Sequence, residues 1–290
     1  MSRPLRIQYP GAVYHVTSRG NDRKEIFRDD EDRKAFLNIL KESQEIYQTV
    51  LFAWVLMENH FHLILETPLG NLDQFMRRFN ISYTGYFNRK YQRVGHLYQG
   101  RYKSLLVEKE SYLSQLSRYI HLNPIRVKEI EPMTVAEKLK ILYAYPWSTL
   151  GGYLDGKKKV PGVDYSLVLE EFGGDHPAGR QGYRKRIKEE IVQGLDLSEK
   201  IVGGNILGKD DFVRWVRRKY MAEDPNREYS GFRKIKGYKA REKILEVLSN
   251  IIYHHSDDMQ AFPCMSKKNQ GLKLDAAINQ LFFIPFAWGR

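Results

Sequence analysis

The chain has 290 residues, of which 42% are apolar, so it can hold a core domain and a further region. Its formal net charge of +12 favours a polyanionic partner, with nucleic acid as the first candidate and an anionic membrane surface as the second. The single cysteine, Cys264, excludes an intrachain disulfide framework and a zinc site of several cysteines. No segment has the apolar length that crosses a bilayer, and the start does not read as a signal peptide, so a cytoplasmic protein is expected.

The first part of the chain predicts alternating strands and helices. Residues 12–19 alternate like a strand, and residues 29–47 place acidic residues before an apolar spacing of 3.6 residues, which predicts a helix. The next expected elements are a pair of strands joined around Glu58 and Asn59, a helix, a strand and a helix that Pro124 ends, over residues 50–57 with 61–66, 70–91, 101–108 and 111–124. Phe75, Phe79 and Tyr83 are expected among the buried residues of the helix at 70–91.

This order of elements predicts an α+β fold of ferredoxin-like type, with one antiparallel sheet and helices packed on it. Glycine, lysine and proline become frequent before residue 160, which predicts a boundary there. We therefore expect a domain over residues 1–160 and a mainly helical region over 161–290, with helices near 209–221 and 238–255. That second region is a candidate for DNA binding, although its apolar ending does not resemble a recognition helix.

A basic stretch follows the paired strands. Between Asp73 and Glu108 there is no acidic residue. The basic residues in this stretch that we predict to bind DNA are Arg77, Arg78, Arg89, Lys90, Arg93, Arg101 and Lys103. Aromatic residues lie between them, and cations beside stacking rings are what a single-stranded nucleic acid needs. The alternative is a helix whose aromatic side chains form core and whose cations face solvent.

Two histidines interrupt the expected strand at 61–66. Successive side chains of a strand point to opposite faces, so His60 and His62 lie on one face, with Phe61 on the other. Neighbouring neutral imidazoles can bind a divalent metal, but the spacing alone is weak evidence and a third ligand is needed. The remaining histidines do not have the spacings of known zinc motifs.

The helix at 111–124 offers the missing groups. Tyr119 and Asn123 are four residues apart and share one helix face. An amide oxygen of Asn123 could complete the metal site, and the phenol of Tyr119 could act as a nucleophile on a phosphodiester. On spacing alone, the simpler interpretation is a packed tyrosine and a helix-ending asparagine.

Five sequence blocks favour the catalytic interpretation of Tyr119 and Asn123 over the packing one. In order, they resemble the REP-associated tyrosine transposases of the HUH single-tyrosine superfamily. They are residues 3–37, "MENHFHLILET" (57–67), "GHLYQGRYKSLLVE" (95–108), "YLSQLSRYIHLNPIRV" (112–127) and "YPWSTLGGY" (145–153). The resemblance covers about residues 2–155.

The resemblance implies a domain that nicks and rejoins single-stranded DNA carrying short palindromic hairpins, with Mg²⁺ or Mn²⁺ as cofactor. It implies that His60 and His62 are metal ligands, that Asn123 is the polar ligand, and that Tyr119 is the nucleophile of a 5′-phosphotyrosine intermediate. Members of the superfamily work as monomers or homodimers, and the sequence leaves that choice open.

Other interpretations remain open at this stage. Tyr112 lies two helical turns before Tyr119, roughly 10 Å along the axis, and is a second candidate nucleophile. A domesticated relative that only binds repeated palindromes would not need the catalytic set. A metal-dependent nuclease that uses water would need the histidines but not Tyr119.

Overall fold

The structure, a computed structural model, describes residues 6–220. Its first six main elements are β1 (Ala12–Arg19), α1 (Asp30–Tyr47), β2 (Val50–Met57), β3 (His60–Thr67), α2 (Leu72–Lys90) and β4 (Lys103–Val107). Each coincides with a predicted element to within two residues at either end. Phe75, Phe79 and Tyr83 are fully buried, as expected from their spacing.

Local sequence explains where α1 begins and ends. The carboxylate of Asp29 accepts a hydrogen bond from the backbone N–H of Asp32, and acidic residues fill the first turn, where they meet the positive end of the helix dipole. Gln48 ends the helix in a left-handed conformation. The ammonium of Lys90 contacts both Asp29 and Asp32, so the start of α1 is tied to the end of α2.

The four central strands are ordered β2-β3-β1-β4, and every neighbouring pair among them is antiparallel. With the two helices this is the β-α-β-β-α-β arrangement of a ferredoxin-like domain, so the predicted fold is confirmed. Two short strands, β5 (Ile201–Val202) and β6 (Ile206–Leu207), extend the sheet beyond β4. Because β6 runs parallel to β4, the complete sheet is mixed rather than wholly antiparallel.

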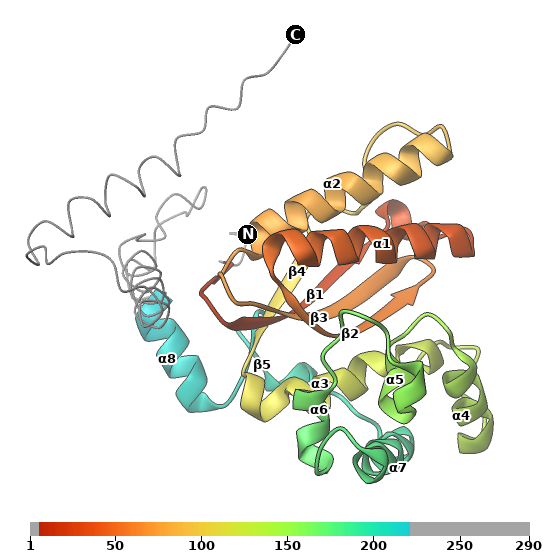
Figure 1. Cartoon of the computed structure of the whole chain (residues 1–290), viewed down its shortest axis with the longest axis vertical. Coiled ribbons are helices and arrows are strands. Elements are labelled where there is room, and N and C mark those ends of the chain that lie inside the picture. Colours follow the sequence, from red (N-terminus) through yellow and green to blue (C-terminus); the bar gives the residue numbers. More distant parts are fainter. Residues whose placement is uncertain (1–5, 221–290) are drawn as a thin grey trace, which may run out of the picture. The chain divides into compact units, whose positions relative to one another are not determined.

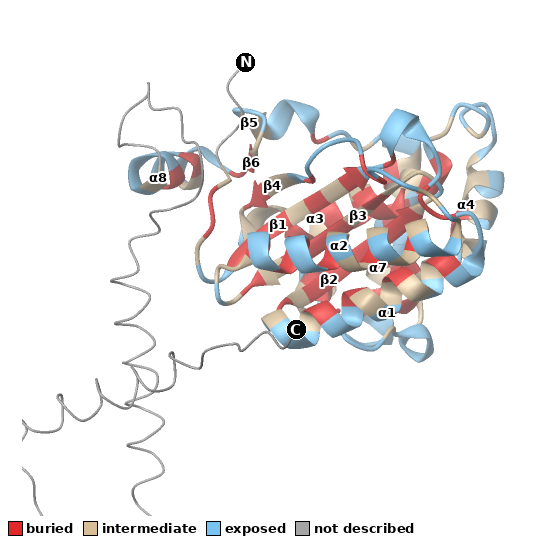
Figure 2. Ribbon diagram, turned by 90° about the horizontal axis from the view of Figure 1, so that it is seen from above, coloured by how far each residue is buried: buried red, intermediate tan, exposed pale blue. Residues whose placement is uncertain are grey.

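Each face of the sheet has its own hydrophobic core. Helices α1 and α2 cover one face, where Phe61 and Leu63 of β3 pack with Phe36, Phe79 and other residues (Figure 1). The opposite face packs against α3 (Lys109–His121), and we call it the α3 face. Figure 2 shows that α1 and α2 expose one stripe and bury the other, as amphipathic helices do.

Apart from β5 and β6, the regular elements in the rest of the described chain are helices. After α3 come α4 (Val135–Ala144), α5 (Leu150–Leu154), α6 (Ser166–Leu169), α7 (Pro177–Gln193) and α8 (Asp210–Tyr220). Helices α5, α6 and α7 pack on the α3 side of the sheet (Figure 1). Elements on both sides of residue 160 therefore share one core, and the division at 160 stays a prediction about the chain's organisation.

Some predictions fall outside the described residues, namely the helix near 238–255, Cys264 and most of the proposed C-terminal DNA-binding region. The helix expected at 209–221 is present as α8, whereas β5 and β6 were not predicted. Among residues 6–220 no helix is both long enough and apolar enough to span a membrane.

Candidate active site

His60 and His62 lie side by side on the α3 face of β3. Their ring centroids are 5.1 Å apart, and Phe61 between them points into the core under α1 and α2. The strand pairing places Arg19 beside His60 and Thr17 beside His62. Both residues are half-buried, and the strand pairing on β3 holds them in place.

The Nδ1 atom of each histidine has a partner in the structure. His60 Nδ1 is 2.7 Å from Asn59 Oδ1, while the amide nitrogen of Asn59 donates to the carbonyl of Arg23 at 3.0 Å. His62 Nδ1 is 2.8 Å from Nε2 of His15 on β1. In the part of the chain that the structure describes, His62 Nε2 is buried without a hydrogen-bond partner.

The surroundings of the histidines disfavour positive charge on the rings. Burial, followed by the charge of Arg19, lowers the pKa of His60 to about 4. Burial lowers the pKa of His62 well below its usual range, and His15, His60 and Arg126 lower it further. Both rings are thus neutral at pH 7, which is the form of imidazole that ligates metals.

Helix α3 carries the predicted nucleophile at the same side of the sheet. Leu116 and Ile120 are buried in the core of the α3 face, and Tyr119 is half-buried at its edge. The side chain of Asn123 donates to the carbonyls of Ile120 at 2.9 Å and Tyr119 at 3.3 Å. Asn123 therefore closes the end of the helix, as the simpler interpretation expected, and its Oδ1 remains as the atom of this amide that could bind a metal.

Arg126 joins the tyrosine and histidine parts of the site. Its guanidinium carbon lies 4.4 Å from the centroid of the Tyr119 ring, and the group also donates to the carbonyl of Leu195. The same charge adds, after burial and the two neighbouring histidines, to the lowering of the pKa of His62. Sequence reasoning missed Arg126, although its place seven residues after Tyr119, past a proline that ends the helix, was visible in the sequence.

A buried polar network attaches α3 to α7 and to Thr149. Arg118 is 2% exposed and bonds Glu190 of α7 at 2.8 Å. His121 is fully buried, and its two ring nitrogens bond the hydroxyls of Tyr183 and Thr149, each at 2.8 Å. His121 is therefore structural, and Tyr119 is presented by a helix that is fixed on its opposite side.

The two histidines supply only part of the ligand set that a divalent cation needs. Among the residues described, no group of three or more histidine, cysteine, aspartate or glutamate side chains has the geometry of a metal site. The buried, unpartnered Nε2 of His62 and the neutral state of both rings nevertheless fit a ligand role. Further ligands would have to be oxygens, for which the amide of Asn123 and a phosphate of a substrate qualify.

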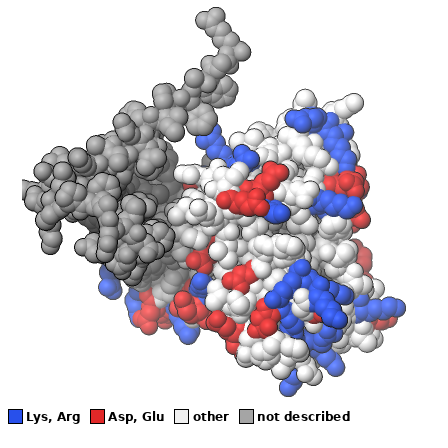
Figure 3. Space-filling view, viewed as in Figure 1, with Lys and Arg blue, Asp and Glu red and all other residues white. Residues whose placement is uncertain are grey.

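The predicted DNA-binding cations do not form one surface. Arg77, Arg78 and Arg89 are exposed on α2, which covers the other face of the sheet from the histidines. Lys90 is held by Asp29 and Asp32. In the face drawn in Figure 3, basic side chains form separate groups with acidic ones among them.

The other three predicted cations lie on β4 or in the segment that precedes it. Lys103 pairs with Thr17, which pairs with His62, so these three side chains share the α3 face across neighbouring strands. At two strand spacings, Lys103 is roughly 10 Å from His62. Arg93 and Arg101 belong to the segment between α2 and β4, and Arg101 is exposed. Contact of any of these residues with DNA stays a prediction.

The aromatic residues of the basic stretch are mainly core. Tyr83 and Phe87 are fully buried, and Tyr98 and Tyr102 are each 8% exposed. The hydroxyl of Tyr91 bonds the carboxylate of Asp32 at 2.8 Å. The packing alternative therefore holds for these rings, which are not free to stack on bases.

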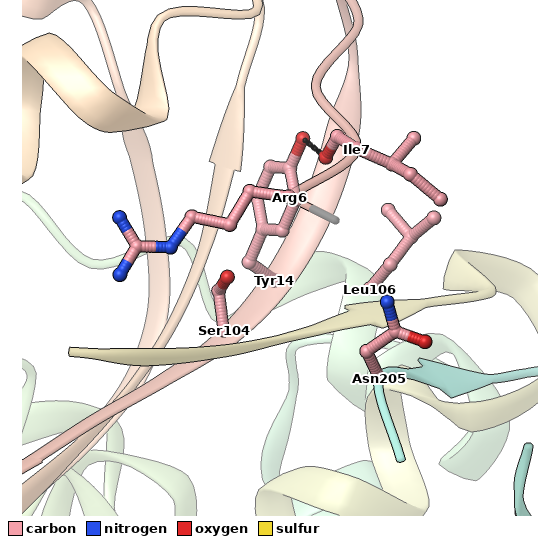
Figure 4. Close-up of a pocket in the computed structure, with 6 residues that line it drawn as sticks. All are labelled: Arg6, Ile7, Tyr14, Ser104, Leu106 and Asn205. Atoms are coloured by element: carbon pink, nitrogen blue, oxygen red, sulfur yellow. Dashed lines mark hydrogen bonds between the residues drawn. The ribbon is translucent and has the colours of Figure 1, made fainter. Parts of the chain in front are cut away.

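A small cavity lies away from the histidines (Figure 4). It is lined by Arg6, Ile7, Tyr14, Ser104, Leu106 and Asn205. Tyr14 and Leu106 belong to the core under α1 and α2, on the face of the sheet opposite His60 and His62. The cavity is not part of the candidate active site.

The candidate site thus combines a ferredoxin-like sheet, two histidines on one face of it and a tyrosine-bearing helix against that face. Residues 8–123 match the family described as "Transposase IS200 like", and the match includes His60, His62, Tyr119 and Asn123. The match lies within the region covered by the five sequence blocks, and it confirms the transposase assignment made from them. No curated protein matches the chain.

Two solved structures are similar to the chain. One is a REP-associated tyrosine transposase bound to a REP hairpin, at 17% identity and a TM-score of 0.43, covering 58% of this chain and 93% of that one. The other is a candidate transposase from Deinococcus radiodurans R1, at 19% identity and a TM-score of 0.30, covering 41% of this chain and 95% of that one.

Proposed function

We propose that this transposase is a metal-dependent enzyme that nicks and rejoins single-stranded, hairpin-containing DNA through a phosphotyrosine on Tyr119. The observation that carries the proposal is the joint arrangement of His60, His62, Tyr119 and Arg126. The His60 and His62 rings lie side by side on the α3 face, and the phenol of Tyr119, with the guanidinium of Arg126 over its ring, belongs to the helical layer that packs on that face. A protein that only binds DNA has no need of this combination.

His60 and His62, with the amide oxygen of Asn123, are the residues that would hold Mg²⁺ or Mn²⁺. When bound, the cation supplies Lewis-acid polarisation of the scissile phosphate. Histidine ligands suit Mn²⁺ better than Mg²⁺, because Mg²⁺ prefers an all-oxygen set.

The chain's own groups provide the chemistry of strand cleavage. The phenol oxygen of Tyr119 attacks phosphorus, a bond forms between them, and the bond from phosphorus to the 3′ oxygen breaks. The phenol loses its proton, and the departing 3′ oxygen gains one, which leaves a 5′-phosphotyrosine and a free 3′-hydroxyl. Attack by a 3′-hydroxyl in the reverse direction rejoins the strand and frees Tyr119.

Cations around the site suit an anionic substrate. Arg19 neighbours His60, Lys103 lies two strands from His62, and Arg126 contacts the ring of Tyr119. A phosphodiester placed among them gains charge-assisted hydrogen bonds in a partly desolvated site. The attachment of α3 to α7 of the same chain supports a site completed within one protomer rather than across a dimer.

The proposal is tested by incubating the full chain with 5′- or 3′-labelled single-stranded hairpin DNA from its own genomic neighbourhood. A denaturing gel should show a protein-linked band that requires Mn²⁺ or Mg²⁺ and disappears with a chelator. A 3′ label should stay with the protein, because the phosphotyrosine joins Tyr119 to the strand on the 3′ side of the cut. A 5′ label should be released with the fragment that carries the free 3′-hydroxyl. Tight binding without an adduct under any metal would favour the non-catalytic DNA-binding protein, and cleavage without an adduct would favour a water-using nuclease.

Arg126→Met is expected to slow adduct formation by about 10²–10³-fold, because it removes the charge beside the attacking phenol while keeping most of the side-chain length. Single-turnover rates at saturating DNA measure the effect, and Arg126→Lys should recover part of it. Arg184 offers a matched control, since it also lies over a tyrosine ring, at 5.2 Å from the centroid of Tyr143, and donates to a backbone carbonyl. Equal rates for Arg126→Met and Arg184→Met would remove Arg126 from the site.

A further inference from the structure

We infer that His15 is a positioning residue for His62 and fixes the proton of that ring on Nδ1, so that Nε2 is presented as a bare lone pair to the metal. This inference rests on the proposed function, because it assigns how the metal site is prepared. His15 lies on another strand, 47 residues before His62 in the sequence.

The sheet brings the two rings together as a diagonal pair. His15 of β1 is directly opposite Ile64 of β3, so His62 is its diagonal neighbour on the same face. The rings are stacked, with centroids 5.1 Å apart and planes inclined by 15°, and His15 Nε2 is 2.8 Å from His62 Nδ1. One of these two nitrogens must carry the shared proton.

The environment of His62 Nε2 indicates which nitrogen that is. A proton on Nε2 would make a buried N–H group without an acceptor, which is costly. With the proton on Nδ1, the hydrogen bond to His15 is satisfied, and Nε2 is an unprotonated atom available to a cation. The neutral ring of His15 then accepts through Nε2.

Asn59 makes the same arrangement at His60, which supports this assignment. Because the amide nitrogen of Asn59 donates to the carbonyl of Arg23, its Oδ1 is an acceptor, and His60 must donate from Nδ1. Both histidines are therefore oriented through Nδ1, which leaves the two Nε2 atoms equivalent in role. Outer hydrogen bonds of this kind fix ring orientation and tautomer in metal sites.

The matched variants are His15→Gln and His15→Leu. Glutamine can place Oε1 near the position of the imidazole Nε2 and keep the acceptor, whereas leucine fills similar space without one. Nitrogen-15 NMR of the histidine side chains in metal-free protein should show His62 protonated on Nδ1 in the wild type and in His15→Gln. That tautomer should be lost in His15→Leu.

Mn²⁺ affinity of the full chain, measured by electron paramagnetic resonance of the free ion, provides the second measurement. We expect His15→Leu to weaken Mn²⁺ binding by about 10–100-fold and His15→Gln to restore most of it. Val13→Ala, on the same strand and face, controls for general loosening of the core, and thermal unfolding of each protein controls for folding.

The outcomes separate the inference from the proposed function. A wild type that binds no Mn²⁺ but has His62 protonated on Nδ1 contradicts the metal site and leaves the pairing of the rings in place. A wild type that binds Mn²⁺ as tightly as His15→Leu, or His62 protonated on Nε2, overturns the inference. Equal losses in His15→Gln, His15→Leu and Val13→Ala would also overturn it, since packing alone would explain them.

Discussion

Replacing Tyr119 with phenylalanine is expected to abolish the covalent protein–DNA adduct while DNA binding is retained. The substitution removes only the phenol oxygen, which is the atom that attacks phosphorus in the proposed reaction. The ring that Arg126 contacts and that packs at the edge of the α3 core stays in place. We therefore expect the free energy of unfolding to change by less than about 1 kcal/mol.

Tyr112→Phe is the matched control for that experiment. Tyr112 lies on the same helix, is also half-buried against the same core, and has a cation near its ring, with Lys200 Nζ 5.6 Å from the centroid. It should form the adduct at the wild-type rate. Adduct formation by Tyr119→Phe, together with its loss in Tyr112→Phe, would transfer the nucleophile to Tyr112.

The parts of the site that could be predicted are those set by local periodicity. The two-residue period of a strand places His60 and His62 on one face, and the short spacing from Tyr119 places Asn123 just beyond α3, which ends at His121 rather than at the expected Pro124. Both arrangements depend on residues close together in the sequence. The same reasoning explains why the burial of Phe75, Phe79 and Tyr83, spaced by four residues, was predicted correctly.

The parts that could not be predicted depend on long-range pairing. The contact of His15 with His62 requires the register of β1 against β3, which sequence spacing does not reveal. Strands β5 and β6 have two residues each, too few for a periodic signal; β6 pairs with β4, and β5 pairs in turn with β6. The contact of Asn59 with His60 is local, since the two residues are adjacent, but the sequence indicates only that Asn59 lies in the turn.

Charge along the sequence proved a poor guide to charge in space. The stretch between Asp73 and Glu108 contains no acidic residue, yet Lys90 contacts the carboxylates of Asp29 and Asp32 at the start of α1, which are 61 and 58 residues away in the sequence. Helix α2 also carries its arginines on the side of the molecule away from the histidines. The cations nearest the site, Arg19 and Arg126, come instead from outside that stretch.

His60→Ala is expected to lower metal-dependent cleavage by on the order of 100-fold or more at limiting Mn²⁺, because it removes one of the two imidazole ligands. His60 is the first residue of β3 and is half-buried. The substitution removes its hydrogen bond to Asn59. The fold should therefore persist, with a cost of about 1 kcal/mol to the free energy of unfolding.

Three measurements on His60→Ala distinguish a ligand from a structural residue. Cleavage should recover in part as Mn²⁺ is raised, the Mn²⁺ dissociation constant should rise with it, and thermal unfolding without metal should stay close to that of the wild type. His96→Ala, which removes an exposed histidine from the segment between α2 and β4, should change none of these values. Unchanged Mn²⁺ affinity and cleavage in His60→Ala would mean that the metal binds elsewhere. A loss of cleavage that no concentration of Mn²⁺ restores would instead indicate that His60 holds the DNA.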